Sequence, residues 1–324
     1  MNVKCVLAAA TGLLAVVSMA LPAAAQSFTK TVRIIVPFAP GGTSDILARL
    51  IAPKMQESIG QTVIVENKPG AGGNIGAYQV ANADKDGHTV LLIDVSTLAI
   101  APSMLAKMTY SPTKDLAPVG MILFAPYVLA AHPSLPATTV AELVAYAKAN
   151  PGKVAFANAG IGVANHIAGL QLTAAWGVDM IHVPYKGGAD AIKAVIGGEG
   201  QLILNGATAT AGFVKQGQLK GLAVTGDQRV ESIKEVPTFT ELKLAAAESG
   251  TWQGVLTAAG TPPAMVEKLN AELNKALAHP DVAKRVQEIG GQMKAGKPGD
   301  VATWLEANTA SYARIIKDAG IKPE

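Results

Sequence analysis

Short runs of aliphatic and β-branched residues alternate with Gly-rich turns and Ala-rich stretches along most of this chain. The apolar run 32–36 is followed by the turn 37–42, and apolar residues then recur at helical spacing over 46–58. The same order returns at 153–158, where the turn 159–166 leads into another helical stretch. Because helical crossovers join parallel strands, this alternation predicts an α/β fold whose mostly parallel sheets are flanked by helices.

Two later apolar runs, 118–131 and 252–258, are expected to cross between two lobes. The first continues through Pro126, and the second precedes three helical segments that each open with proline. The amphipathic spacing of these segments predicts surface helices packed on the first lobe. The predicted division is residues 26–125 with 252–324 for lobe 1, and 126–251 for lobe 2.

Residues 1–25 have the pattern of a signal peptide. Lys4 gives a positive start, the apolar core 6–21 is too short to span a bilayer comfortably, and Ala23–Ala25 fits the cleavage pattern. Cleavage before Gln26 would leave 299 residues, enough for two lobes with substantial cores. We therefore expect an exported protein, located in the periplasm.

Composition excludes several kinds of site. Cys5 is the only cysteine and would leave with the signal peptide, so disulfides and cysteine-ligated metals are excluded. The five histidines show no paired ligand spacing, and we expect no metal and no cofactor. The net charge is +3, or +2 once Lys4 is removed, without a basic cluster. Nucleic acid and membrane surfaces are therefore not expected partners, and a monomer is expected.

The turn after the first strand has the features of an anion site. Gly41 and Gly42 let a ligand approach the backbone closely, and Thr43 stands where a helix should begin. The first N–H groups of a helix have no intrahelical partners and carry partial positive charge. A carboxylate or phosphate would fit there, although an ordinary capped turn would show the same pattern.

Polar residues follow other strands at positions that could share this rim. Ser96 and Thr97 come directly after the strand 89–94, and ligands collect outside the carboxyl ends of parallel strands. Helix capping is an equal alternative for these two residues. His166 stands at the start of the helix after the second glycine turn, where it could donate to a ligand or to a neighbouring carbonyl.

The glycine loop 70–73 suggests a dinucleotide-binding turn, but its spacing fails. The third glycine of G-x-G-x-x-G would fall at position 75, which is Ile75. An exported protein also has little access to nicotinamide cofactors. A tight, closely packed loop is the better interpretation.

Six motifs in order resemble one family across the whole predicted mature chain. They are VPFAPGGTSD (36–45), ENKPGAGGNIGA (66–77), HVPYKGG (182–188), LAVTGDQR (222–229), VPTFTE (236–241) and WQGVLTAAGTPPAMVEKLN (252–270). The chain resembles the Bug proteins, also called the TctC family, which are extracytoplasmic solute receptors of tripartite tricarboxylate transporters.

The resemblance implies a type II-like periplasmic binding protein with two lobes and a ligand cleft between them. It also implies a small carboxylate ligand, such as a di- or tricarboxylate, an amino acid or an aromatic acid, and membrane permease subunits as partners. Each glycine turn would hold the carboxylate from one lobe. The expected ligand-binding residues are Phe38, Ala39, Gly41, Gly42, Thr43, Asp45, Ser96, Thr97, Asn158, Gly160, Gly162, His166, Tyr185 and Asn205.

Some positions depart from the family pattern. Val163 stands where a small hydroxyl residue is common, which removes a hydrogen-bond donor. Gln201 and Asn205 replace frequent acidic residues, and the amide at Asn205 would favour a more anionic or less amine-bearing ligand. Asp45 would repel a ligand carboxylate, so it either faces away as a cap or accepts from an amino, hydroxyl or water group on the ligand. We expect the second role.

Two other functions are weighed against a transport receptor. A ligand-presenting receptor for a membrane sensor kinase would have the same sequence features. An exported hydrolase could use Ser44, Asp45 and His166 as a triad, but the G-x-S-x-G elbow is absent around Ser44. We therefore expect a binding protein, not an enzyme.

Overall fold

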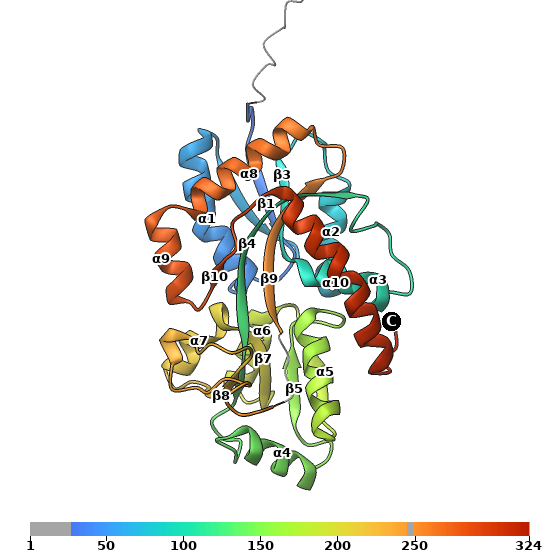
Figure 1. Cartoon of the computed structure of the whole chain (residues 1–324), viewed down its shortest axis with the longest axis vertical. Coiled ribbons are helices and arrows are strands. Elements are labelled where there is room, and N and C mark those ends of the chain that lie inside the picture. Colours follow the sequence, from blue (N-terminus) through green and yellow to red (C-terminus); the bar gives the residue numbers. More distant parts are fainter. Residues whose placement is uncertain (1–26, 245–248, 324) are drawn as a thin grey trace, which may run out of the picture.

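The computed structural model describes residues 27–244 and 249–323 and shows two α/β lobes, one above the other (Figure 1). The lobes share one continuous sheet in the order β2-β1-β3-β9-β4-β7-β5-β6, and β8 and β10 also pair with β4. The predicted signal peptide lies outside the described residues. Within those residues, no helix is long and apolar enough to cross a membrane. The predicted two-lobe α/β class is confirmed.

The first lobe is built on three parallel strands. β1 (Val32–Val36) pairs with β2 (Val63–Asn67) on one side and β3 (Thr89–Asp94) on the other. β1 and β3 are almost entirely buried because helices cover both faces of this parallel sheet. The segments that follow the three strands are α1 (Thr43–Ile59), η1 (Ala71–Gly73), α2 (Asn74–Ala81) and α3 (Val95–Met104).

Two long strands connect the lobes, as the apolar runs predict. β4 (Leu116–Ala131) and β9 (Gly250–Ala258) pair antiparallel and run from one lobe into the other (Figure 1). β4 continues through Pro118 and Pro126, and its register with β9 shifts just after Pro118 and again before Leu123. Such irregularities accommodate residues that cannot donate to the ladder.

The second lobe repeats the strand–turn–helix order. β5 (Ala155–Asn158) lies between β6 (Ile181–Pro184) and β7 (Leu202–Gly206), and all three are parallel. β8 (Lys220–Val224) pairs antiparallel with β4. The helices of this lobe are α4 (Val140–Ala149), α5 (Ala164–Trp176), α6 (Gly188–Ile196), α7 (Ala207–Lys215) and the short η2 (Glu231–Ile233).

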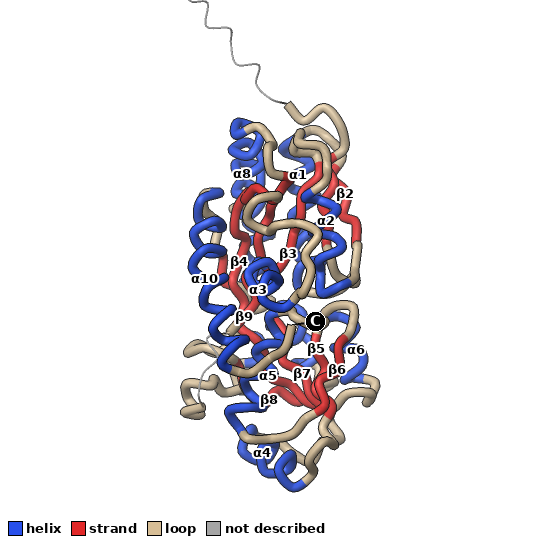
Figure 2. Tube along the Cα trace, turned by 90° about the vertical axis from the view of Figure 1, so that its right-hand side faces the viewer, coloured by secondary structure: helices blue, strands red, loops and turns tan. Residues whose placement is uncertain are grey.

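The C-terminal segment returns to the first lobe but does not stay there. Its elements are α8 (Pro263–Leu277), α9 (Pro280–Glu288), β10 (Gln292–Met293) and α10 (Pro298–Asp318). The prolines begin the three helices as predicted. However, Ile316 of α10 is buried in one cluster with Leu143 and Phe156 of the second lobe. The expectation that these helices pack only on the first lobe is wrong for α10, since a helix of 21 residues is about 30 Å long. Figure 2 shows α10 running alongside both lobes.

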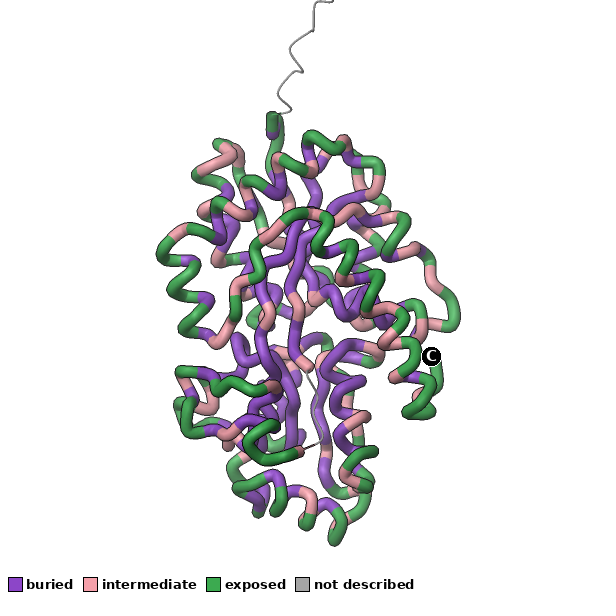
Figure 3. Tube along the Cα trace, viewed as in Figure 1, coloured by how far each residue is buried: buried purple, intermediate pink, exposed green. Residues whose placement is uncertain are grey.

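The buried core follows the connecting strands. Figure 3 shows buried residues along the central strands of both lobes and exposed residues on the outer helices. Leu129 and Ala130 on β4 and Leu256 on β9 are fully buried. These packed strands hold the polar residues near their crossing point at fixed positions.

Candidate functional site

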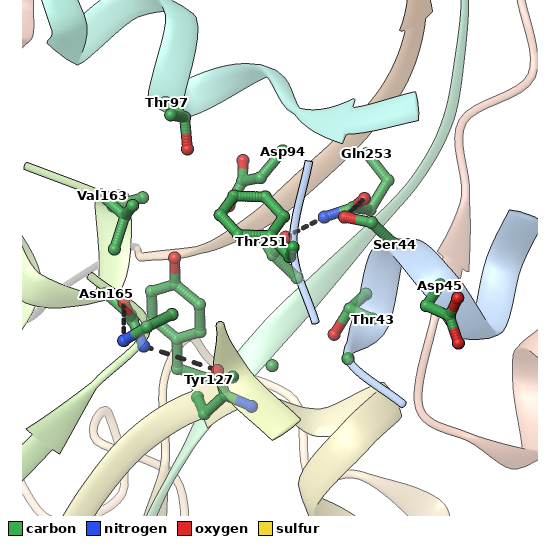
Figure 4. Close-up of a pocket in the computed structure, with 17 residues that line it drawn as sticks. Thr43, Ser44, Asp45, Asp94, Thr97, Tyr127, Val163, Asn165, Thr251 and Gln253 are labelled. Carbon is green, nitrogen blue, oxygen red and sulfur yellow. Dashed lines mark hydrogen bonds between the residues drawn. The ribbon is translucent and has the colours of Figure 1, made fainter. Parts of the chain in front are cut away.

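A cavity of about 50 Å³ lies between the two lobes (Figure 4). Its walls come from the start of α1, the end of β3, the connecting strands β4 and β9, and the second-lobe segments around β5 and β7. These are the carboxyl ends of the parallel strands in both lobes, where α/β sheets usually place ligands.

The structure separates the fourteen predicted site residues into two groups. Those that line the cavity are Phe38, Gly42, Thr43, Asp45, Thr97 and Asn205. Those that do not line it are Ala39, Gly41, Ser96, Asn158, Gly160, Gly162, His166 and Tyr185. The predicted regions are therefore brought together, but several residues in them have other contacts.

The first helix presents its N-terminus to the cavity. α1 begins at Thr43, with Gly42 as its N-cap in an extended conformation, and no side chain caps the helix start. Gly42, Thr43 and Ser44 all line the cavity. The helix dipole and the uncapped N–H groups therefore face the space between the lobes, where they would attract an anion.

Two side chains of this helix start also contact more distant parts of the chain. Thr43 Oγ1 accepts a hydrogen bond of 2.8 Å from Thr208 Oγ1 at the start of α7 in the second lobe. Ser44 Oγ donates to Gln253 Oε1 on β9 at 2.7 Å. These bonds fix the helix start against both the connecting strand and the opposite lobe.

Asp45 lines the cavity, but protein groups already bind its carboxylate. Its carboxylate accepts from Gly41 N–H at 2.9 Å, from Arg49 Nε at 3.0 Å and from Asn67 Nδ2 at 2.9 Å. Burial alone would raise the pKa of Asp45, but these three hydrogen bonds and the Arg49 charge hold it below its usual value. The geometry supports the first of the two roles weighed for Asp45, a local cap of the turn, and acceptance from a ligand stays a prediction.

Two other residues of the first turn also use their N–H groups within the protein. Gly41 N–H is bound to Asp45, as described above, and Ala39 N–H donates to the carbonyl of Lys186 in the second lobe at 3.0 Å. These two N–H groups are therefore not free for a ligand. The anion-accepting part of the turn is limited to the residues that begin α1.

On the second lobe, the start of α5 forms much of the cavity wall, and Ala159 is the residue of the preceding turn 159–162 that lines it. Val163, Ala164 and Asn165 line the cavity, and no side chain caps this helix. Gly160 and Gly162 instead line a separate hollow. That hollow also includes Gly72, Met104 and Tyr185.

Side chains of the second turn bind its own backbone. Asn158 Oδ1 accepts from Gly160 N–H at 3.0 Å, and His166 Nδ1 accepts from Gly162 N–H at 3.2 Å. Nδ1 accepts, so the ring proton is on Nε2. Burial, together with the neighbouring His182, lowers the pKa of His166 to about 4, and the ring is neutral near pH 7. This bond uses only Nδ1 and holds the turn, the Nε2–H group remains a donor, and the donation from His166 to a ligand stays a prediction.

Asn205 is placed at the cavity by a network of amides and hydroxyls. Its Oδ1 lies 3.4 Å from Asn165 Nδ2, and its Nδ2 donates to Thr210 Oγ1 at 3.3 Å. A Cβ at Gly188 would lie only 2.7 Å from Asn205 Oδ1, so this glycine permits the close packing. Asn205 therefore lines the cavity as predicted, with its polar atoms already engaged.

The cavity also has polar residues that sequence reasoning missed. Asp94 at the end of β3, Tyr127 on β4, and Thr251 and Gln253 on β9 all line it. Asp94 Oδ1 accepts from the N–H groups of Ser96 at 3.1 Å and of Trp252 at 3.2 Å. Burial nevertheless raises the pKa of Asp94 to about 6. The sequence signal that could have identified these positions is a polar residue within an apolar strand or at its end.

Several buried polar atoms near this wall have no protein partner among the described residues. They are Ser96 Oγ, Thr97 Oγ1, Tyr127 Oη and Asn158 Nδ2. Thr97 and Tyr127 are each 2% exposed and line the cavity. Because burying an unpaired hydroxyl costs free energy, these two groups are suited to bind a ligand.

The geometry gives the hydrolase hypothesis no support. Ser44 donates to Gln253, Asp45 binds Arg49 and Gly41, and His166 binds Gly162. The three side chains of the conceivable triad thus have separate partners. In the described parts of the chain, no group of three or more His, Cys, Asp or Glu side chains could hold a metal ion.

Comparisons with known proteins agree with the two-lobe architecture. The model of the tripartite tricarboxylate transporter family receptor, TctC, matches residues 47–321. BugT of Bordetella pertussis is 31% identical over 99% of both chains. The solved structure of the periplasmic binding protein BugD is 35% identical, has a TM-score of 0.88, and is matched over 92% of this chain and 100% of its own. Rpa4515 of R. palustris, solved with adipate, is 32% identical with a TM-score of 0.87, over 91% and 99% of the two chains.

These similarities extend over nearly all of the chain that follows the predicted signal peptide. The receptors of this family are periplasmic, bind small carboxylates and work with membrane transporters. The family match and the Bug relatives confirm the resemblance of the six sequence motifs. The chain belongs to the TctC family of periplasmic solute receptors.

Proposed function

We propose that this protein binds a small carboxylate between its lobes and delivers it to the permease of a tripartite tricarboxylate-type transporter. The ligand classes considered are di- and tricarboxylates, amino acids and aromatic acids. The observation that carries the proposal is the uncapped start of α1, where Gly42, Thr43 and Ser44 face a cavity with no Lys or Arg among its lining residues. The R. palustris relative Rpa4515 was solved with adipate, which is a small dicarboxylate.

Hydrogen bonds from N–H and hydroxyl groups would supply enough free energy for this binding. A hydrogen bond to a charged group contributes roughly 1.5 to 3 kcal/mol. Micromolar affinity corresponds to about 8 kcal/mol. Three to five such bonds reach that value after the cost of immobilising the ligand. Contacts on both lobes would then favour the closed arrangement that a permease can recognise.

Two substitutions at Thr43 test the role of the helix start. Thr43→Pro and Thr43→Val both remove the hydroxyl, but only proline also removes the N–H at the first helical position, where helices tolerate proline. We expect Thr43→Pro to bind its carboxylate about 10 to 100 times more weakly than Thr43→Val, the ratio that corresponds to one charge-assisted hydrogen bond.

The measurement is isothermal titration calorimetry after a thermal-shift screen of aliphatic, aromatic and amino-bearing carboxylates. A binder should raise the melting temperature in proportion to its concentration and affinity. Equal affinities for the proline and valine variants would contradict the proposed use of the α1 backbone. Binding of a neutral sugar, with every carboxylate inactive, would overturn the proposal as a whole.

Transport is the second part of the proposal and needs a cellular test. Deleting the gene should abolish high-affinity uptake of the identified carboxylate, and a plasmid copy should restore it. Intact uptake together with lost induction of the uptake genes would instead indicate the sensor-kinase alternative.

We also propose that the protein reaches the periplasm by cleavage of residues 1–25, and that residues 26–125 with 252–324 and residues 126–251 form the two lobes. The long connecting strands β4 and β9 support this division, because each includes one proposed boundary. Mass spectrometry of the periplasmic protein should give an N-terminus at Gln26. Retention of the full-length chain would contradict the cleavage.

A further inference from the structure

One carboxylate in the cavity wall has no cationic partner. Asp45 is paired with Arg49, whereas none of the ion pairs among the described residues includes Asp94. Asp94 keeps part of its side chain accessible and lines the cavity. Its Oδ1 accepts from the N–H groups of Ser96 and Trp252, and hydrogen bonds from the Ser96 and Thr251 side chains also lower its pKa. All of these donors are neutral. An ionised Asp94 therefore presents unneutralised negative charge to whatever enters the cavity.

Two unpartnered hydroxyls accompany this carboxylate. Thr97 Oγ1 and Tyr127 Oη are both buried, line the cavity and have no hydrogen-bond partner among the described residues. Figure 4 shows the two hydroxyls pointing into the same space beside Asp94. Each can accept a hydrogen bond. Together with Asp94 they place three side chains that can accept hydrogen bonds on this part of the cavity wall, and each hydroxyl can also donate one.

Three acceptors and one negative charge match the chemistry of a protonated amino group. An ammonium group has three donors and no acceptor. Its positive charge would pair with Asp94, which has no cationic partner among the described residues. A second ligand carboxylate would instead meet a like charge, unless Asp94 first bound a proton. The site is therefore better suited to an ammonium group than to a second anion.

The opposite wall of the cavity carries partial positive charge instead of negative charge. The uncapped start of α1 at Thr43 and Ser44 carries partial positive charge and lies across the cavity from Thr97 and Tyr127 (Figure 4). A zwitterion would place its carboxylate at α1 and its ammonium group beside Asp94. Both ends of such a ligand would then be neutralised on removal from water, which limits the desolvation cost.

The other titratable groups around Asp94 stay in one state near neutral pH. β4 contributes Tyr127, whose pKa burial raises well above its usual value, and α10 contributes Tyr312, whose pKa burial raises to about 12. α1 contributes Asp45, which is bound to Arg49. α3 and β9 contribute only neutral groups to this wall, and His166 of α5 is not among the cavity residues. Asp94 itself, with its pKa raised by burial to about 6, is the group that titrates here.

We propose that Asp94, Thr97 and Tyr127 form an ammonium-binding subsite, which makes the ligand of this receptor an amino carboxylate. The inference rests on the proposed carboxylate binding at α1 and adds the recognition of the second end of the ligand. It predicts a preference for a zwitterion over the dicarboxylate of equal length, which is the opposite of the less amine-bearing ligand that Asn205 led us to expect from the sequence.

Matched ligand pairs test the subsite on the protein without its signal peptide. The pairs are β-alanine with malonate, 4-aminobutyrate with succinate, and 5-aminopentanoate with glutarate, and L-alanine, L-aspartate and L-glutamate complete the panel. Calorimetry at pH 7.5 should show an amino ligand that binds at least ten times more tightly than its matched dicarboxylate. The affinity of this ligand should fall at least tenfold between pH 8 and pH 5, because Asp94 gains a proton in that interval.

Two variants assign the effect to the subsite. Asp94→Asn keeps a side chain that can still cap α3, but it should reduce affinity for the amino ligand at least tenfold and remove the pH dependence. Tyr127→Phe nearly conserves volume and should weaken the amino ligand several-fold without lowering the melting temperature of the ligand-free protein. Thr43→Pro should weaken amino ligands and dicarboxylates alike.

The possible failures of the two proposals can be distinguished. Tighter binding of dicarboxylates, strengthened at low pH in the wild type, would overturn the ammonium subsite and leave carboxylate binding intact. Unchanged affinity of the amino ligand in both Asp94→Asn and Tyr127→Phe would also overturn it. Absence of binding by every amino carboxylate in the panel would overturn the ammonium subsite, and absence of binding by tricarboxylates and aromatic acids as well would overturn both proposals.

Discussion

The starts of α1 and α5 look alike in sequence but differ in what their turns do. Each helix follows a buried strand and a glycine turn, and neither has a side-chain cap. In the first lobe, a charged pair between Asp45 and Arg49 holds the turn, and the helix start itself faces the cavity. In the second lobe, the neutral His166 holds the turn, and the glycines face the other lobe.

The difference shows that a glycine turn can serve the approach of two backbones as well as the approach of a ligand. A Cβ at Gly160 would lie 3.4 Å from Gly72 Cα, and a Cβ at Gly72 would lie only 2.7 Å from the Ile161 carbonyl oxygen. Gly72 also has a φ of +59°, which non-glycine residues rarely adopt. The loop 70–73 and the second turn therefore form a contact between the lobes where only small residues fit.

The largest expected effect comes from filling this contact. Gly72→Ala should reduce ligand affinity about 10- to 100-fold, because the added Cβ would clash with the Ile161 carbonyl oxygen of the other lobe and so oppose the approach of the two lobes. The apparent dissociation constant rises as the closed state becomes less populated. Calorimetry measures the affinity, and small-angle scattering measures the opening of the lobes.

Gly60→Ala is the matched control for Gly72→Ala. Gly60 has a similar positive φ of +72°, but nothing lies within 4 Å of its Cβ position. Both variants carry a backbone penalty of roughly 1 kcal/mol, and only Gly72→Ala should lose affinity. Equal affinities for the two variants would show that the glycine contact is not part of closure.

The second prediction concerns the charged pair that holds the first turn. Asp45→Asn should lower the free energy of unfolding by about 2 kcal/mol at pH 7, since hydrogen bonds to a charged group from Arg49, Asn67 and Gly41 are weakened. The pKa of Asp45 is lowered in the folded protein, so its contribution exists above the usual carboxyl pKa and disappears as the pH falls below about 4.

Urea denaturation between pH 8 and pH 3 measures the contribution of Asp45. The gap between wild type and Asp45→Asn should stay constant down to about pH 5 and close below pH 4. Asp190→Asn at the start of α6 is a control on a more exposed carboxylate and should change stability by less than about 0.5 kcal/mol. A gap that persists at pH 3 would mean that Asp45 acts through packing and not through charge.

The smallest effect is expected at the turn of the second lobe. The pKa of His166 is lowered to about 4 by burial and by His182, so the unfolded chain binds more protons than the folded protein between about pH 6.5 and 4. Stability should therefore fall as the pH is lowered through this interval. His166→Gln, which keeps an acceptor for Gly162, should reduce that loss by about 1 kcal/mol.

Denaturation curves at pH 7.5 and pH 5 test His166. Between pH 7.5 and pH 5 the free energy of unfolding should fall less in His166→Gln than in the wild type. Calorimetry at pH 7.5 should show similar ligand affinity for both proteins. A large loss of affinity in His166→Gln at pH 7.5 would restore His166 as a ligand-binding residue and remove the contrast between the two turns.

Local sequence patterns predicted the elements well because their causes are local. The apolar runs gave the limits of β1 and β3 to the residue, and the prolines marked the starts of α8, α9 and α10. The connecting strands were recognisable as apolar runs that belong to neither lobe alone. α10 was misplaced because helical periodicity shows which face is apolar but not which lobe covers it.

The candidate site was predicted by region more accurately than by residue. The start of α1 was identified because a helix N-terminus has unpaired N–H groups whatever surrounds it. Asp94, Tyr127 and Gln253 were missed because they lie within or at the end of strands, and only the order β3-β9-β4 brings these strands together at the cavity.

The sequence by itself determined the strand–turn–helix order, the position of the two glycine turns before helix starts and, through six motifs, the receptor family. Only the tertiary structure decided which groups of each turn remain open to a ligand. The physical reason is that an N–H group can be bound by a carbonyl from a distant segment, as Ala39 is by Lys186, or by a side chain that folding turns toward it, as Gly162 is by His166. The same packing places Asp94 at the cavity without a cation, a property of its surroundings that no neighbouring residue in the sequence reveals.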